Sequence, residues 1–416
     1  MISRSARRAL GLLFLANLMN FYDRQIVAAL AEAIKVEFAL TDVQVGGLSS
    51  AFELTYPLAA VVLAMAADRW GRRRIISLVV TLWSAATTLS GAAGSYAALV
   101  LARLGTGVGQ GGYGPAAVAT LTEVFPGLYR ARAVAVHDVG MMLGSAAGYL
   151  LGGLIAGAAG WRLSFFLAGL PGLLLAWLIW RLRSRLPAAS LFLSRLSIPQ
   201  LAADTLRQLL AVRTLRVLYT SGVLYYLATG GVIFWLPTFM QRFHGYTLAS
   251  AAAVGGATQV AMGVAGVLVG GWLGDRLMKR HPGGRLMASS LGLIAATPLA
   301  VVAILTPIRP LFLATAGLVL FFYAFSFPCI GPQIHDVTPP SHRVTGQAVF
   351  LFLAHYLGNL PSAPFVGWLS DSGQNLRMGM VIMPVFGLLA ALFMLWGTRF
   401  VGRDVVSVRS LHGGQR

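Results

Sequence analysis

Charged and titratable side chains inside long apolar segments are the residues of this sequence best suited to chemistry. Asp23 and Arg24 lie midway along one such segment, Glu53 and Arg103 lie in two others, and His355 lies in a segment near the end of the chain. An isolated charge at the centre of a membrane helix costs about 2.5–3.5 kcal/mol, so these groups must pair or face a water-filled cavity. A carboxylate there can bind and release a proton, and the pKa of a histidine lies close enough to neutrality for the same task.

Asp23 and Arg24 are adjacent, and adjacent side chains on a helix point about 100° apart. We therefore expect one of them to face a central cavity and the other to face a neighbouring helix. Either they belong to a static ion pair, or Asp23 is a proton site whose salt bridge opens and closes. Arg103 is suited to hold a carboxylate through two hydrogen bonds, so it contacts Asp23 or a substrate anion unless it only anchors helix packing. Gln110 lies about two turns deeper on nearly the same face.

Glu53 shares a helix face with Tyr56, because the two are three residues apart. It is a second candidate proton carrier, or else it makes an ordinary interhelical hydrogen bond. Large aromatic side chains suit either the wall of a cavity that accepts an apolar chain or an ordinary core. The candidates for the cavity wall are Tyr56, Tyr113, Tyr226, Trp235 and Phe239.

The elements that position these residues are membrane helices. Of the 416 residues, 57% are hydrophobic and only 11% are charged, whereas soluble domains carry about 25% charged residues. A transmembrane helix needs about 20 apolar residues in succession. Such runs occupy residues 9–33, 45–66, 75–95, 97–119, 132–157, 163–180, 217–240, 247–273, 286–306, 311–331, 344–368 and 379–398. The sequence thus predicts an all-α membrane protein with twelve transmembrane helices.

The net charge of +19 reports membrane topology and not nucleic-acid binding. Most of the 32 lysines and arginines fall at the termini and in alternate connections, whereas the other connections hold only Lys35, Arg162, Arg242, Arg309 and Arg377. Cytoplasmic loops are enriched in Lys and Arg, so we expect both termini in the cytoplasm. Membrane lipids are the expected partners of the basic face, and nucleic acid is not.

A basic connection divides the chain into two halves of six predicted helices. We expect an N-terminal half over 1–180, a cytoplasmic linker over 181–216, a C-terminal half over 217–398 and a basic tail over 399–416. Within the linker, residues 198–210 have the composition of a helix that lies on the membrane surface. Internal duplication is typical of secondary transporters, whose substrate site lies between the repeats near the bilayer midplane.

An Asp-Arg signature follows the second and the eighth predicted helices. A carboxylate among guanidinium groups at cytoplasmic helix ends can hold one face shut and release it when the ends separate. Membrane topology alone explains the arginines but not the aspartates. The candidate gating residues are Asp68, Arg69, Arg72, Arg73, Asp275 and Arg276.

Small residues recur on one face of the fifth predicted helix. Gly140, Gly144, Gly148 and Gly152 are four residues apart and therefore share that face. Such rows let helix backbones approach closely. We expect this face to pack or slide against another helix and not to contact substrate.

Several motifs resemble those of the major facilitator superfamily, in the same order along the chain. Residues 64–73 are similar to its G-x-x-x-D-R-x-G-R-R signature, with Ala64 in place of Gly, and residues 103–109 resemble its R-x-x-x-G-x-G. Residues 20–24 and 355–364 resemble the N-Y-x-D-R and H-x-x-G-D-x-x-S-P motifs of the spinster-like branch, which transports sphingolipids and lysophospholipids. The resemblance implies two six-helix halves, alternating access and proton-coupled transport of a small amphiphile that involves Asp23, Arg24 and His355.

Two positions depart from the spinster-like pattern. Gln110 replaces a Glu and Asn359 replaces an Asp, so each acid gives way to an amide that forms hydrogen bonds but does not titrate. The number of coupled protons, and a facilitative uniporter, therefore stay open. The substrate-binding candidates are Arg24, Arg103, Gln110, Tyr56, Tyr113, Tyr226, Trp235, His355 and Asn359. The organic-anion:cation symporter branch is the alternative, because it also has N-Y-x-D-R and residues 50–56 resemble its second helix.

Motifs of other protein classes are missing from the sequence. It contains neither H-E-x-x-H, nor G-x-S-x-G, nor a Gly-rich phosphate-binding loop, so we expect no enzyme activity, no metal and no cofactor. A repeated selectivity filter is also missing, and the single Cys329 excludes a disulfide framework. Because only Lys35 and Lys279 are lysines, we expect a bacterial inner-membrane protein, and we expect it to be a monomer.

Overall fold

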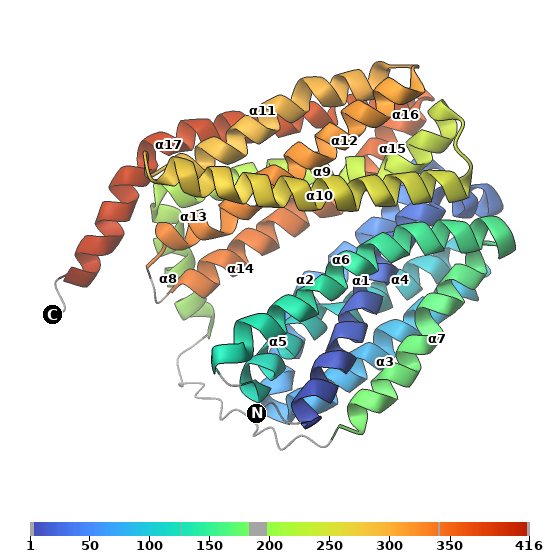
Figure 1. Cartoon of the computed structure of the whole chain (residues 1–416), viewed down its shortest axis with the longest axis horizontal. Helices are drawn as coiled ribbons and strands as arrows, with labels where there is room; N and C mark the ends of the chain where they lie inside the picture. Colours follow the sequence, from blue (N-terminus) through green and yellow to red (C-terminus); the bar gives the residue numbers. More distant parts are fainter. Residues whose placement is uncertain (1–3, 126, 183–197, 340–341, 414–416) are drawn as a thin grey trace. The chain divides into compact units, whose positions relative to one another are not determined.

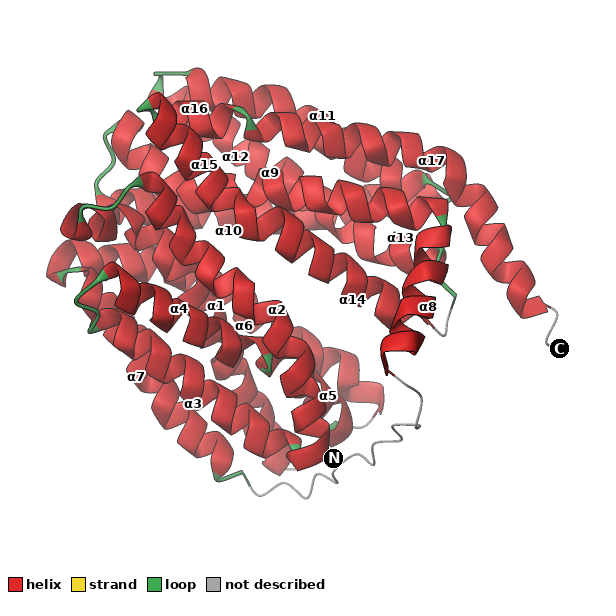
Figure 2. Cartoon of the chain, turned by 180° about the vertical axis from the view of Figure 1, so that it is seen from behind, coloured by secondary structure: helices red, strands yellow, loops and turns green. Residues whose placement is uncertain are grey.

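The computed structural model describes residues 4–125, 127–182, 198–339 and 342–413. In this part of the chain every regular element is a helix (Figure 1, Figure 2). The prediction of an all-α protein is therefore confirmed. The chain divides into two compact units, which are described one at a time.

The first unit contains the described residues of Met1–Phe192 and of Phe234–Ala257. It therefore includes the end of α9 and the start of α10, although both lie in the second half of the sequence. Its other helices are α1 (Arg4–Phe38), α2 (Asp42–Trp70), α3 (Arg72–Gly91), α4 (Tyr96–Gly111), α5 (Tyr113–Val124), α6 (Gly127–Ala159) and α7 (Trp161–Trp180).

The second unit contains the described residues of Leu193–Ile233 and of Thr258–Arg416. Its first helices are α8 (Ile198–Ala211), most of α9 (Arg213–His244), most of α10 (Leu248–Met278), α11 (Gly284–Leu305) and α12 (Arg309–Ser326). The rest are η1 (Phe327–Cys329), α13 (Ile330–Asp336), α14 (Arg343–Leu353), η3 (Ala354–Asn359), α15 (Leu360–Gly373), α16 (Leu376–Val381) and α17 (Met383–Gly413).

Ten helical segments of the described chain are long and apolar enough to cross a membrane. The other two predicted spans correspond to α1 and to the pair α4 and α5. Polar residues such as Asn20 and Asp23 interrupt the apolar sequence of α1, while α4 and α5 are separate helices of 16 and 12 residues that meet at Gly112. The count of twelve spans and the cytoplasmic termini stay predictions.

Described helices cover the predicted linker helix and most of the predicted tail. The helix predicted for residues 198–210 is present as α8 (Ile198–Ala211). The segment predicted as a separate tail from residue 399 continues α17 without a break as far as Gly413. Residues 234–257 group with the first unit, and the predicted division of the sequence into two halves stays a prediction.

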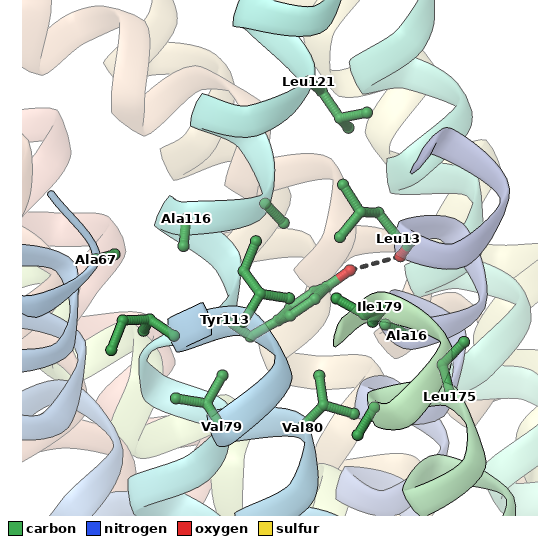
Figure 3. Close-up of a cluster of buried hydrophobic side chains, with 14 of the residues drawn as sticks. Leu13, Ala16, Ala67, Val79, Val80, Tyr113, Ala116, Leu121, Leu175 and Ile179 are labelled. Carbon is green, nitrogen blue, oxygen red and sulfur yellow. Dashed lines mark hydrogen bonds between the residues drawn. The ribbon is translucent and has the colours of Figure 1, made fainter. Parts of the chain in front are cut away.

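The core of the first unit surrounds the side chain of Tyr113, which is 1% exposed. Figure 3 shows its ring among aliphatic side chains of α1, α3, α5 and α7. The phenolic hydroxyl donates to the carbonyl oxygen of Leu13 at 2.5 Å. The ring packs edge to face on Trp83, with 5.4 Å between the two ring centroids. A buried tyrosine hydroxyl needs such a partner, so this bond fixes the position of α5 against α1.

The glycine row of α6 packs directly on α1, as predicted. An added Cβ at Gly140 would lie 2.8 Å from the carbonyl oxygen of Phe14, and Cβ atoms at Gly144 and Gly148 would collide with the carbonyl oxygens of Leu18 and Tyr22. These contacts hold the backbone of α1 in place just ahead of Asp23.

Substitution of one glycine of this row is expected to destabilise the first unit. Gly144→Ala inserts a methyl group against the backbone of α1, and overpacking of this kind costs about 1–3 kcal/mol. We expect a lower thermal unfolding temperature for the detergent-purified protein, followed by intrinsic fluorescence. The matched control is Gly263→Ala in α10, where an added Cβ has no neighbour within 4 Å. Equal unfolding temperatures for the two variants would contradict the role of the row.

Candidate functional site

Four side chains of α1 and α4 form a connected polar group inside the first unit. Gln110 donates from Nε2 to Oδ2 of Asp23 at 2.6 Å, and its Oε1 accepts from Nε of Arg24 at 2.9 Å. Nη1 of Arg103 lies 3.7 Å from Oδ1 of Asp23. We call Asp23, Arg24, Arg103 and Gln110 the charge bridge. All four are candidates from the sequence, and the structure brings them together.

The two neighbours of Gln110 determine how its amide is oriented. An ionised carboxylate only accepts hydrogen bonds and a guanidinium only donates them, so Nε2 must face Asp23 and Oε1 must face Arg24. A carboxyl group at this position would satisfy both neighbours only in its protonated form. Gln110 therefore provides the hydrogen bonds of a protonated acid but has no proton to release.

Asp23 and Arg103 are 1% and 3% exposed, yet their mutual contact is incomplete. Oδ1 of Asp23 and the Nε and Nη1 atoms of Arg103 have no hydrogen-bond partner among the described residues. The attraction within a buried ion pair offsets the cost of desolvation only when the geometry of the pair is good and its remaining polar atoms are hydrogen-bonded. An anion at Arg103 would bond to these donors, and a proton on Asp23 would leave the buried guanidinium without a counter-charge. The pair is therefore suited to exchange partners.

Aromatic rings surround the guanidinium of Arg24, which is half-buried. Its Cζ atom lies 4.7 Å from the ring centroid of Phe21, 5.2 Å from that of Phe52 and 4.3 Å from that of Tyr56. Each such cation–π contact contributes about 0.5–2 kcal/mol. The Cζ atom of Arg103 also lies 5.2 Å from the ring of Phe52. The site therefore combines positive charge with an apolar wall.

Glycines of α4 set the close approach between α2 and α4 that places these rings. An added Cβ at Gly107 would lie 2.5 Å from the carbonyl oxygen of Phe52, and one at Gly111 would collide with the carbonyl oxygen of Tyr56. The backbone of α2 therefore rests directly on α4. This contact positions Phe52 and Tyr56 beside the charge bridge.

The prediction that Asp23 and Arg24 face different surroundings is wrong in one respect. Both hydrogen-bond to the same amide, that of Gln110. The difference of about 100° in direction between adjacent Cβ atoms is bridged by the long side chain of Arg24. Their burial does differ, since Asp23 is enclosed and Arg24 is half-buried.

Glu53 lies on α2 directly after Phe52 and is 7% exposed. This burial agrees with either interpretation from the sequence, a proton carrier or a member of an interhelical hydrogen bond. Its role in proton coupling stays a prediction.

In the second unit, His355 and Asn359 lie in the π-helical turn η3 between α14 and α15. The ring centroid of His355 lies 5.3 Å from that of Tyr226 on α9. An added Cβ at Gly230 would collide with Oδ1 of Asn359. Single π-helical turns inside α-helices occur frequently at functional sites. The structure therefore places His355, Asn359 and Tyr226 in one region of this unit.

Two aromatic candidates are almost fully buried. Trp235 is 0% exposed and Tyr113 is 1% exposed. The hydroxyl of Tyr113 also lies 3.2 Å from Nε2 of His137. The burial of both side chains fits the alternative that the sequence leaves open, in which both residues belong to the core.

The gating candidates have partners that the sequence does not indicate. Nη1 of Arg72 bonds to Oε1 of Glu123, and Nη1 of Arg73 donates to the carbonyl oxygen of Leu182 at 2.6 Å. Arg69 is exposed, and the side chain of Asp68 lies outside the described residues.

The second copy of the signature contains a bridge centred on another arginine. Arg285 of α11 donates to Oδ1 of Asp275 at 3.0 Å and to Oδ2 of Asp336 at 2.6 Å. Arg276 instead lies over the ring of Trp272 at 5.3 Å. Sequence reasoning missed Arg285 because its partners are 10 and 51 residues away.

A second ion-pair cluster, in the first unit, was also not predicted from the sequence. Arg242 donates to Oε2 of Glu32 at 2.8 Å and to both carboxylate oxygens of Asp42 at 2.9 Å, and Lys35 bonds to Asp42. We call these four residues the ion-pair clasp. A usable signal was that Lys35 and Arg242 are among the few basic residues outside the basic connections. In the described chain no three His, Cys, Asp or Glu side chains gather as metal ligands would.

Comparisons with known proteins agree with this architecture. Residues 13–360 match the family model of the Major Facilitator Superfamily. An MFS-type efflux pump of Mycolicibacterium smegmatis is 32% identical over 380 residues, which cover 89% of this chain and 85% of that protein. The sphingosine-1-phosphate transporter SPNS2 of Danio rerio is 32% identical over 146 residues, 35% of this chain and 29% of that protein.

The solved structures include a bacterial homolog of the human lysosomal transporter Spinster, in an inward-facing and occupied conformation. Its superposition gives a TM-score of 0.85 at 25% sequence identity and covers 97% of this chain and 99% of that one. These findings confirm the resemblance to spinster-like proteins that the motifs indicate. The chain belongs to the major facilitator superfamily of membrane transporters.

Proposed function

We propose that the chain moves an amphipathic, lipid-like solute across the membrane by alternating access and couples this movement to protons. Transport itself follows from membership of the superfamily. The observation that carries the finer proposal is the charge bridge, which sets one titratable carboxylate beside two guanidinium groups and an aromatic wall.

An amphiphile with an anionic head group suits this site better than a sugar. Arg24 offers positive charge, while the rings of Phe21, Phe52 and Tyr56 offer apolar contact but few hydrogen bonds. The similarity to a protein named as a sphingosine-1-phosphate transporter supports the same class. An aromatic carboxylate would also fit Arg24 and the rings. A proton-coupled organic-anion symporter is therefore the second candidate.

Coupling follows from competition for Arg103. While Asp23 is ionised, its negative charge lies 3.7 Å from Arg103 and repels a second anion. A proton on Asp23 removes that negative charge, so Arg103 can then attract the head group of the substrate. Because Gln110 does not titrate, Asp23 is the one proton site of the charge bridge.

The ion-pair clasp is suited to stabilise one of the conformations of the alternating-access cycle. Arg242 belongs to the second half of the sequence, whereas Glu32, Lys35 and Asp42 belong to the first. Hydrogen bonds between charged groups contribute about 1.5–3 kcal/mol, so the clasp stabilises the conformation in which it is closed. A movement of the end of α9 away from α1 and the start of α2 would have to break it.

Asp23→Asn is expected to abolish transport driven by a pH gradient, because an amide cannot carry the proton. The measurement is flux of labelled lysophospholipid and of a small aromatic carboxylate in proteoliposomes, with and without a pH gradient. We expect the wild type to move the lysophospholipid faster with the gradient. The variant should lose this stimulation while it elutes as a folded protein in gel filtration.

The control for this experiment is Asp371→Asn, which neutralises an exposed aspartate of α15 and should behave as wild type. Movement of the carboxylate alone would replace the lipid proposal by the organic-anion symporter. Stimulation that persists in Asp23→Asn would rule out Asp23 as the proton site. A wild type without any response to the gradient would be a uniporter.

Gln110→Glu is expected to make transport fall as the pH rises. At low pH a protonated Glu reproduces the hydrogen bonds of the amide. At higher pH two ionised carboxylates would face each other at hydrogen-bonding distance, and like charges so placed repel. The measurement is the initial rate of uptake against pH without a gradient, with Gln208→Glu, at an exposed position of α8, as the control. Identical pH profiles for wild type and Gln110→Glu would refute the comparison of Gln110 with a protonated acid.

Arg242→Gln is expected to open the ion-pair clasp more often. Loss of about 1.4 kcal/mol corresponds to a tenfold shift in a two-state equilibrium. A cysteine introduced at Ala31, which is 1% exposed, should react with a soluble maleimide about tenfold faster in this variant. Cys329 is buried and sets the background, and Arg309→Gln, at an exposed arginine, is the control. An unchanged reaction rate would exclude the clasp as a gate.

A further inference from the structure

A groove lies between the first turns of α9 and the last part of the membrane-spanning region of α17, within the second unit. Its volume is about 300 Å³. Arg213, Arg216 and Thr220 line one side, and Phe393, Trp396 and Phe400 line the other. None of these residues belongs to the charge bridge, the ion-pair clasp or the region of His355.

The spacing of these residues explains why they line one groove. Positions three, four and seven residues apart share a helix face, and both helices follow this pattern. The two helices touch beside the groove, because an added Cβ at Gly397 would lie 2.6 Å from Cγ1 of Val217. The backbone N–H of Thr214 also donates to Oδ2 of Asp404 at 2.8 Å. Both walls of the groove are thus held in place.

Two exposed arginines give the groove positive charge. Arg213 and Arg216 are exposed, and no carboxylate of the described chain forms an ion pair with either of them. The nearby Asp404 is engaged by the start of α9. The Cζ atom of Arg213 lies 5.8 Å from the ring of Phe400. Two guanidinium groups therefore remain available to an anion at one end of an aromatic surface.

The aromatic side of the groove is open. Phe393 is 38% exposed and Trp396 is 49% exposed, and both lie on a segment apolar enough to cross a membrane. Lipid chains therefore cover these rings in the bilayer. Tryptophan is enriched where apolar chains meet head groups, and basic pockets between helices on the cytoplasmic side bind anionic head groups.

We propose that this groove binds an anionic phospholipid, with its phosphate at Arg213 and Arg216 and the upper part of an acyl chain along Phe393 and Trp396. The cavity is large enough for a head group but not for a whole lipid. A soluble anion would gain nothing from the aromatic wall. A zwitterionic lipid offers no net charge to the two arginines.

The test compares lipids by their effect on thermal unfolding of the detergent-purified, full-length protein. Phosphatidylglycerol should raise the unfolding temperature of the wild type by about 2–4 °C more than phosphatidylcholine does. Arg213→Gln/Arg216→Gln should lose this difference. The matched control is Lys279→Gln/Arg280→Gln, which removes two exposed charges from the turn between α10 and α11 and should keep it.

A second measurement keeps the proposal testable if the double variant is unstable. Native mass spectrometry of the wild type should show retained phosphatidylglycerol that is lost as ionic strength rises, because salt screens exposed charges. Equal effects of the two lipids, or equal responses of the two double variants, would overturn the proposal. An equal shift with inorganic phosphate would also overturn it, in favour of a soluble-anion site.

Discussion

The packing of the first unit depends on one interaction. The neutral amide of Gln110 bonds to a buried carboxylate on one side and to a half-buried guanidinium on the other. Gln110 can hydrogen-bond to both Asp23 and Arg24 only if α1 and α4 keep a fixed separation, since bonds of 2.6 and 2.9 Å leave the two helices little freedom to move apart. The glycine row of α6 fixes α1 from one side, and glycines of α4 admit the backbone of α2 from another. Close packing of small residues thus positions the charged side chains of the charge bridge.

The sequence predicts the identity of the site better than its geometry. The cost of a charge in a membrane helix singles out Asp23, Arg24 and Arg103, and their motif adds Gln110. That both Asp23 and Arg24 bond to one amide depends on the reach of a flexible side chain, which helical spacing does not encode. The same limit applies to Tyr113, because spacing alone does not distinguish a core tyrosine from one that lines a cavity.

Helix content and packing faces were predictable for a simple physical reason. Apolar runs of about 20 residues have few alternatives to a membrane helix, and a four-residue glycine spacing defines a face whatever its partner. Contacts distant in sequence were not predictable. The bridge centred on Arg285 and the clasp centred on Arg242 join residues up to 51 and 210 positions apart, and neither forms a local pattern.

The arginines of this chain therefore differ by their surroundings and not by their number. Arg24 and Arg103 are held by aromatic rings and a carboxylate inside the first unit, where little water screens their charge. Arg242 and Arg285 each join two carboxylates. Arg213 and Arg216 are exposed without a carboxylate partner among the described residues, which leaves them available to the phosphate of the proposed lipid. A basic excess that first indicates membrane topology thus also supplies the charge bridge, the ion-pair clasp and the positive side of the groove, because each arginine acts through the groups placed around it.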